Sequence, residues 1–231
     1  NVSIMKNHEL KNIDVIFTAL PHGEAHLISK KIRNNSVLID LSADFRLNDP
    51  KLYQEYYGST PISPDWLPKA QYGLPELHEL SWEKSPLIAS PGCYPTSIIT
   101  PLAPLLENGL IETSDIIVNS ISGISGAGKN ASEHLLFCER NESAGVYGLP
   151  KHRHLSEIEE QLSQFAQKTI ALSFHPHLGP MNRGICSTIS VRAKGGLHAK
   201  LITKCWEDTY SGRPFVQILK TSFKSKKEKK L

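Results

Sequence analysis

The sequence predicts two joined domains: an α/β domain on a partial doubly wound parallel sheet, and an α+β domain with a mixed or antiparallel sheet. Near the start of the chain, a strand–helix–strand pattern forms a βαβ unit, which requires a parallel sheet. Later, residues 169–178 and 184–192 alternate apolar and polar side chains, which is typical of an antiparallel sheet with one covered face. The 231 residues, 39% of them hydrophobic, are enough for one large domain or two small ones.

The βαβ unit occupies the first forty residues. Residues 12–20 are apolar and rich in β-branched side chains, which predicts a buried strand. Residues 24–33 have the apolar spacing of a helix, and residues 37–41 form a second predicted strand. The following residues, 47–85, are rich in Pro, Tyr and Gly, so we expect a connection over the surface.

Two segments lie at the carboxyl ends of these strands, where ligands bind in parallel sheets. They are residues 19–22 and residues 42–46. Arg46 is therefore a candidate anion clamp, and its alternative is a surface ion pair with Asp44 or Asp49.

A cysteine stands at the next turn from strand to helix. Residues 86–89 predict a strand, Pro91-Gly92 forces a turn, and residues 93–108 have helical spacing, with two internal prolines that predict a bend or an early end. Unpaired N–H groups and the helix dipole at such a position favour the thiolate, which is the nucleophilic form of cysteine. From the residues alone, Cys93 is either a nucleophile or a buried structural cysteine.

A predicted strand, residues 115–121, enters a loop of Gly, Ser and Ala at residues 122–128, before a predicted helix at 130–137. Such a loop can offer backbone N–H groups to a phosphate or a carboxamide. Its spacing differs from that of the phosphate loop of nucleoside triphosphatases.

Two histidines, His152 and His154, precede an amphipathic helix for which Ser156 and Glu159 predict a capping box. Two histidines within three residues favour a general base. Because no third ligand stands at a convincing spacing, we predict no metal site. Arg183, between the two alternating segments, is a second candidate anion binder.

The end of the chain predicts a helix at 197–209, a short strand at 215–219 and a basic tail at 220–231. The tail holds six lysines, no arginine and a single aromatic residue, Phe223, so we expect solvent exposure and no nucleic-acid binding. No segment predicts a membrane span or a signal peptide. Four widely spaced cysteines argue against a zinc ribbon or a disulfide scaffold and favour a cytoplasmic location.

Five motifs in one order closely resemble the N-acetyl-γ-glutamyl-phosphate reductase family. They occupy residues 40–46, 72–77, 90–96, 122–128 and 152–154, and the resemblance runs from about residue 12 to about residue 218. The wider group includes aspartate-semialdehyde dehydrogenase, which shares the cysteine turn and the Ser-Gly-Ala-Gly loop. Together, the domain pattern and the resemblance divide the chain into a partial dinucleotide-binding domain (1–92), a catalytic and dimerisation domain (93–219) and the tail.

The resemblance implies the chemistry. The Cys93 thiolate attacks an acyl phosphate and forms a thioester, and NADPH reduces the thioester to N-acetylglutamate 5-semialdehyde in arginine biosynthesis. His152 or His154 would be the acid/base, and we favour His152 because it lies further from the expected helix cap. The resemblance also implies a homo-oligomer with a small-molecule substrate and with no nucleic-acid or membrane partner.

Binding residues follow from the same resemblance. Arg46 would bind the phosphate, and Arg153 and Arg183 could hold the substrate carboxylate. The nicotinamide side of the NADP pocket would be lined by Pro21, Ser125 and Gly126.

Two departures from the family stand out. No Gly-rich dinucleotide fingerprint occurs, so we expect the first βαβ unit of the family to be missing, and the lysine tail replaces the family's last segment. The alternative is therefore a catalytically defective remnant of the enzyme. A third possibility, aspartate-semialdehyde dehydrogenase, is disfavoured by Tyr94-Pro95 and by the His-Arg-His motif.

Overall fold

The computed structural model describes residues 13–29, 36–61, 63–81, 83, 85–128 and 130–219, and every structural statement below concerns these residues. The basic tail and the end of the predicted helix 24–33 lie outside them. The helices and strands are β1 (Val15–Thr18), α1 (Ala25–Ser29), β2 (Val37–Asp40), α2 (Pro50–Tyr57), β3 (Gln71–Tyr72), β4 (Leu87–Ala89), α3 (Cys93–Glu107), β5 (Ile116–Ser122), α4 (Phe137–Arg140), β6 (Gly145–Val146), α5 (Arg153–Ala166), β7 (Leu172–Leu178), β8 (Ile185–Ser190) and α6 (Ala199–Thr209).

The first sheet is parallel throughout, as predicted. Its strands lie in the order β1-β2-β4-β3, and Thr18 pairs with Asp40, which pairs with Ala89. Since these strands run in the same direction, the residues that follow β1, β2 and β4 meet at one edge of the sheet. Leu38 and Leu87 are fully buried in its core.

The connection at residues 47–85 is more ordered than predicted, because it contains α2 and a 3-10 helix at Pro64–Lys69. The carboxylate of Asp49 accepts a hydrogen bond from the N–H of Lys51, and Pro50 occupies the first turn of α2. The helix ends at Gly58, whose φ of 71° suits a residue without a side chain. An Asp-Pro start and a Gly end are helix signals that the overall composition of the segment masked.

The second sheet is mixed, with the order β6-β7-β5-β8. The two alternating segments became β7 and β8, but they are not neighbours, because β5 lies between them. β5 runs parallel to β7 and antiparallel to β8, so the sheet is the mixed one of the two predicted kinds, mixed or antiparallel. Alternation along β5 buries Val118 and leaves Ile117 and Ile121 about two-fifths exposed. One face of this sheet is therefore covered and the other is open.

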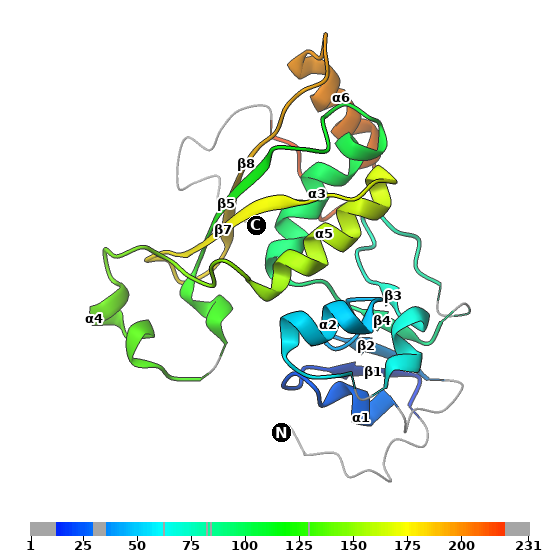
Figure 1. Ribbon diagram of the computed structural model, residues 1–231, viewed down its shortest axis with the longest axis vertical. Coiled ribbons are helices and arrows are strands. Elements are labelled where there is room, and N and C mark those ends of the chain that lie inside the picture. Colours follow the sequence, from blue (N-terminus) through cyan, green and yellow to red (C-terminus); the bar gives the residue numbers. More distant parts are fainter. Residues whose placement is uncertain are drawn as a thin grey trace.

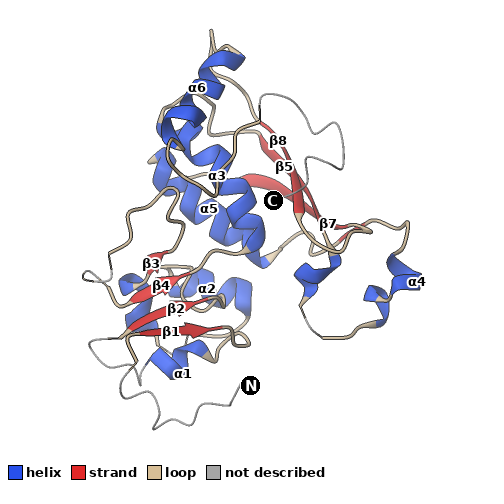
Figure 2. Cartoon of the chain, turned by 180° about the vertical axis from the view of Figure 1, so that it is seen from behind, coloured by secondary structure: helices blue, strands red, loops and turns tan. Residues whose placement is uncertain are grey.

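Helices α3 and α5 lie side by side on the covered face, and α5 also reaches the first sheet's domain (Figures 1 and 2). The core beneath this sheet contains Ile98 and Ile99 from α3, and Ile158 and Leu162 from α5. Because α3 carries Cys93 and α5 carries His154, their packing brings the two sequence-predicted motifs together.

Helix α3 continues through Pro101 and Pro104 to Glu107, so the predicted early end does not occur. A proline has no N–H, and Pro104 therefore leaves the carbonyl of Thr100 without its helical donor. The hydroxyl of Tyr210, just after α6, donates to that carbonyl instead. The indole N–H of Trp206 donates to the carbonyl of Pro101 at 2.9 Å. Contacts from α6 thus stabilise the proline-containing turns.

The predicted strand at 215–219 is also wrong, because these residues are irregular. Phe215 is 88% exposed, and no described strand pairs with it.

Replacing Tyr210 by phenylalanine is expected to lower the free energy of unfolding by about 1–3 kcal/mol. The substitution removes a buried hydroxyl donor and leaves the carbonyl of Thr100 without a partner. Burial raises the pKa of Tyr210, so the hydroxyl stays protonated and able to donate. Urea denaturation measures the change. Tyr57→Phe is the matched control, because the buried hydroxyl of Tyr57 has no partner among the described residues and its removal should cost nothing. Equal losses in both variants would contradict this account.

Candidate active site

Cys93 lies at the strand-to-helix turn that the sequence predicts. β4 ends at Ala89, and Cys93 is the first residue of α3, after the N-cap residue Gly92. Its side chain is exposed, which removes the alternative of a buried structural cysteine. The carbonyl of Gly92 accepts the first helical hydrogen bond, from the N–H of Thr96 at 3.0 Å. The thiol is therefore presented at the amino end of a four-turn helix.

Helix α5 begins earlier than the predicted capping box. His152 is its N-cap, and its Nδ1 accepts a hydrogen bond from the N–H of His154 at 3.1 Å. Ser156 instead bonds to the carbonyl of Arg153, and Glu159 accepts from the N–H of Leu172. The capping box is thus wrong. Because Nδ1 of His152 is an acceptor, the neutral ring carries its proton on Nε2.

His154 lies against the cysteine turn. A Cβ added to Gly92 would stand 2.6 Å from Nε2 of His154 and 2.9 Å from Nη1 of Arg46, so a side chain there would displace one or both of them. The imidazole packs edge-on against Tyr94 and His152, and its Nδ1 is buried without a partner among the described residues.

The environment keeps both imidazoles neutral. Burial, followed by electrostatic repulsion from Arg46 and, in acid, from protonated His152, lowers the pKa of His154 to about 2. Burial and then Arg153 lower the pKa of His152 to about 4. Near neutral pH both rings are therefore neutral, which is the form that a general base needs, but their low pKa values make them weak acceptors of a thiol proton.

A cavity of about 420 Å³ opens at this point. It collects five of the predicted site residues, which are Cys93, His152, Arg153, His154 and Gly126. Its other lining residues are Tyr94, Ser122, Ala127, His134, Leu135, Arg140, Gly145, Val146, Tyr147 and Leu178. Two arginines and no acidic residue line it, so the cavity suits an anionic molecule.

Arg46 lies behind the cysteine turn and is 8% exposed. Its guanidinium donates to the carbonyls of Ser90 and Leu41 at 2.8 and 2.9 Å, and Nη1 stands 3.4 Å from the carboxylate of Glu157. The predicted alternative of a surface ion pair with Asp44 or Asp49 is therefore wrong, because the ionic partner is Glu157.

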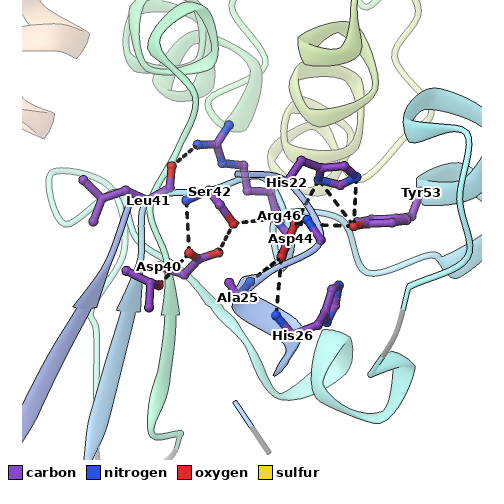
Figure 3. A network of polar contacts seen from close by, with 11 residues as sticks. His22, Ala25, His26, Asp40, Leu41, Ser42, Asp44, Arg46 and Tyr53 are labelled. Carbon is purple, nitrogen blue, oxygen red and sulfur yellow. Dashed lines mark hydrogen bonds and ion pairs between the residues drawn. The ribbon is translucent and has the colours of Figure 1, made fainter. Parts of the chain in front are cut away.

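The acidic residues of the same motif form a buried network at the strand ends (Figure 3). Asp40 accepts from the hydroxyls of Thr18 and Ser42 at 2.7 and 2.6 Å. Asp44 accepts from the N–H groups of Gly23 and Ala25 at 2.7 and 3.0 Å, and from Nδ1 of His22 at 2.9 Å. Burial alone would raise the pKa of Asp44, but the hydrogen bonds from His22 and Gly23 outweigh it, so the pKa is lowered.

The remaining predicted residues lie outside the lining of the cavity. Ser125 is in a short 3-10 helix, Ile124–Ala127, and its N–H donates to the carbonyl of Asn182. The backbone of Arg183 packs against Gly123, where an added Cβ would come within 2.7 Å of it. Pro21 is exposed in the turn after β1. The expected helix at 130–137 is instead a 3-10 turn followed by the short α4.

Two candidate site residues were not predicted from the sequence. Arg140 lines the cavity, and nothing in its sequence context marks it. Glu157 is fully buried and accepts from the N–H of Gly92, directly before the cysteine. Its one available signal is its position three residues after His154, which places both on one face of a helix.

Within the described ranges, no cluster of three or more His, Cys, Asp or Glu side chains could hold a metal ion. In the same part of the chain, no helix is long and apolar enough to cross a membrane.

Comparison with known proteins gives two matching family models. The model described as semialdehyde dehydrogenase, dimerisation domain, matches residues 93–230, and the model described as semialdehyde dehydrogenase, NAD binding domain, matches residues 1–85.

Curated relatives are named N-acetyl-gamma-glutamyl-phosphate reductase, which confirms the resemblance. The relative from Akkermansia muciniphila is 49% identical over 89% of this chain and 60% of its own length, and that from Clostridium botulinum is 45% identical over 92% and 62%. The chain thus spans about three-fifths of the length of the curated relatives it matches.

Solved structures of aspartate semialdehyde dehydrogenases share the fold. The enzyme from Francisella tularensis superposes with a TM-score of 0.62 at 15% identity, covering 88% of this chain and 65% of that one. Aspartate semialdehyde dehydrogenase II from Vibrio cholerae has a TM-score of 0.61 at 13% identity, covering 86% and 61%.

Proposed function

Because the chain belongs to the semialdehyde dehydrogenase family, we propose that it carries the catalytic site of an N-acetyl-γ-glutamyl-phosphate reductase, which makes N-acetylglutamate 5-semialdehyde for arginine biosynthesis. The observation that carries this proposal is the exposed Cys93 beside the neutral His154, in a cavity that holds two arginines and no acid. The names of the curated relatives supply the substrate.

The chemistry begins at the thiol. A neutral histidine takes the proton of Cys93, and the sulfur attacks the acyl carbon, so that a C–S bond forms and phosphate leaves with the electron pair of the C–O bond. Reduction of the thioester carbon would then need a hydride, which a nicotinamide held at the Gly126 side of the cavity would supply. The resulting thiohemiacetal then breaks its C–S bond, which releases the aldehyde and regenerates the thiolate.

His154 is the better candidate for the base. His152 was favoured on the premise that it lies further from the helix cap, but His152 is itself the cap and its Nδ1 is occupied by the N–H of His154. Nε2 of His154 lies beside Gly92, next to the nucleophile. His152 then acts as a donor from Nε2 at the same cavity.

The arginines divide between two anionic groups of the substrate. Arg153 lines the cavity and can hold the α-carboxylate. Nη1 of Arg46 lies beside Gly92 and retains a donor for the leaving phosphate. The backbone of Arg183 packs against Gly123, so its side chain has to extend past the loop at residues 122–128 to reach the substrate.

We propose a nicotinamide cofactor, NADP, in agreement with the matched NAD binding domain. The fit is good at the nicotinamide end, where Gly126 lines the cavity and an added Cβ would press on Ser122. Pro21 and Ser125 remain candidates at that end. The start of α1 does not fit a pyrophosphate, because the carboxylate of Asp44 already occupies its N–H groups. The pyrophosphate therefore requires residues other than those at the start of α1.

We also propose that two copies associate through the open face of the second sheet. Ile117 and Ile121 are exposed there, and the matching family model is described as a dimerisation domain. The free thiols of the four cysteines agree with a cytoplasmic location.

Two other functions were considered for this chain. A catalytically defective remnant would keep the thiol and histidine without turnover. An aspartate-semialdehyde dehydrogenase is less supported, because the likeness to those structures is at 13–15% identity and concerns the fold alone.

Fluorescence titration of the purified chain with NADPH and with NADH tests the cofactor. We expect saturable NADPH binding with a dissociation constant on the order of micromolar, and weaker NADH binding. Addition of the acyl phosphate should then oxidise the bound NADPH. Equal affinity for the two nucleotides would reject the NADP assignment, and binding without oxidation would favour the defective remnant.

A further inference from the structure

Glu157 lies one turn after His154 on α5, and the chemistry above gives it no part. Its carboxylate is fully buried. Oε1 accepts from the N–H of Gly92 at 2.8 Å and from the hydroxyl of Tyr72 at 2.7 Å, and Oε2 faces Nη1 of Arg46 at 3.4 Å. One side chain thus contacts residues from three other sequence motifs.

Burying a carboxylate is costly unless hydrogen bonds and an opposite charge compensate for the lost hydration. Burial raises the pKa of Glu157, and Arg46 and the N–H of Gly92 oppose that rise. A buried carboxylate is tolerated only where hydrogen-bond donors are held close to it. The Glu157 carboxylate and its donors therefore fix each other's positions.

The cysteine turn depends on this external contact. The N-cap of α3 is glycine, so the helix has no capping side chain of its own. The carbonyl of Gly92 is bonded within α3 to Thr96, while its N–H points to Glu157. The orientation of the peptide before Cys93 is therefore set from α5, the helix that also carries His154.

We propose that Glu157 is a positioning residue, which fixes the turn of Cys93 against His154 and Arg46 from the helix that carries the base. A role of Glu157 in catalysis rests on the proposed function. Its effect on the Cys93 thiol can be measured without turnover. The positioning depends on the reach of the carboxylate and on its acceptor oxygens.

Two substitutions separate reach from charge. Glu157→Asp keeps the charge but shortens the side chain by one methylene, so that it cannot reach Gly92 and Arg46 together. Glu157→Gln keeps the length and an acceptor oxygen but loses the charge. Glu160→Gln is the control, since Glu160 lies on the same helix and accepts from the N–H of Asn48 at 3.1 Å, away from the cysteine turn.

The readout is the rate of Cys93 alkylation by iodoacetamide at pH 7, followed on the Cys93 peptide by mass spectrometry. Circular dichroism checks that each variant is folded. We expect Glu157→Asp to react about tenfold more slowly, and Glu157→Gln and Glu160→Gln to stay within about threefold of the unsubstituted chain. A folded Glu157→Asp variant that reacts at the original rate, or a Gln variant slower than the Asp variant, would overturn the proposal.

A second measurement needs no substitution. Amide hydrogen exchange should show a protection factor for Gly92 at least about tenfold above that of Cys93, the first helical residue. Equal exchange at both amides would overturn the proposal even if the variants do not fold. Neither measurement involves reduction of an acyl phosphate, so loss of turnover with a confirmed Glu157 effect would reject only the proposed function.

Discussion

Replacing Cys93 by serine is expected to abolish phosphate release from N-acetyl-γ-glutamyl phosphate, with a loss of roughly four orders of magnitude in rate. The hydroxyl is a far weaker nucleophile than the thiol and gains little from the start of α3. In the unsubstituted chain, mixing with substrate should release one equivalent of phosphate in a burst, before any nucleotide is added. A phosphate-binding fluorescent sensor follows the burst.

Cys138→Ser is the matched control for this experiment. Cys138 is also an exposed free thiol, and it lies in α4, next to the cavity-lining Arg140. We expect its burst to match that of the unsubstituted chain. A burst that survives in Cys93→Ser and disappears in Cys138→Ser would move the nucleophile to α4.

Replacing His154 by glutamine is expected to slow the same burst by roughly 10²–10⁴-fold, as for the loss of a general base. The pH profile gives a second readout. Because the pKa of His154 is lowered to about 2 and that of His152 to about 4, neither ring should protonate between pH 5 and 8. The burst should therefore show no inflection near pH 6.5, the ordinary range of histidine. An inflection there that disappears in His154→Gln would contradict the buried, neutral base.

The same two histidines affect stability with a definite sign. Their pKa values are lower in the folded than in the unfolded chain, so below about pH 6.5 the unfolded chain binds more protons. As the pH is lowered from about 6.5 to about 4, the free energy of unfolding should decrease by up to about 1.4 kcal/mol per pH unit for each ring. Urea denaturation at a series of pH values should show a shallower fall in His154→Gln than in the unsubstituted chain, and equal slopes in both would contradict this account.

Local sequence patterns predicted the individual helices and strands better than they predicted which strands pair with each other. The parallel sheet followed from the apolar runs of β1 and β2, and Cys93 was placed correctly because its turn is set by adjacent residues. Alternation in β7 and β8 predicted which side chains face the core. It could not predict that β5 inserts between them, because pairing between distant strands depends on packing.

The site shows the same limit. The motifs of Arg46, Cys93 and His154 were all identified, but the sequence offered Asp44 and Asp49 as partners for Arg46, because they are nearby in the chain. The partner is Glu157, 111 residues away. In sequence, a buried carboxylate inside an amphipathic helix resembles any solvent-facing glutamate apart from its spacing from His154, and its partner is identified only by the packing of α5 against the first domain.

The hydrogen bonds of α5 make the two sides of the cavity mechanically unequal. On one side, Glu157 anchors the cysteine turn to the helix that carries His154, and Glu160 separately anchors Asn48 to the same helix. On the other side, residues 133–143 carry mostly exposed side chains on two short helical elements. We therefore expect a molecule in the cavity to meet one wall tied down by these hydrogen bonds, which carries the proposed reacting groups, and a second, less anchored and more compliant wall. Changes in substrate size should be accommodated by the compliant wall, with the spacing of thiol and imidazole preserved.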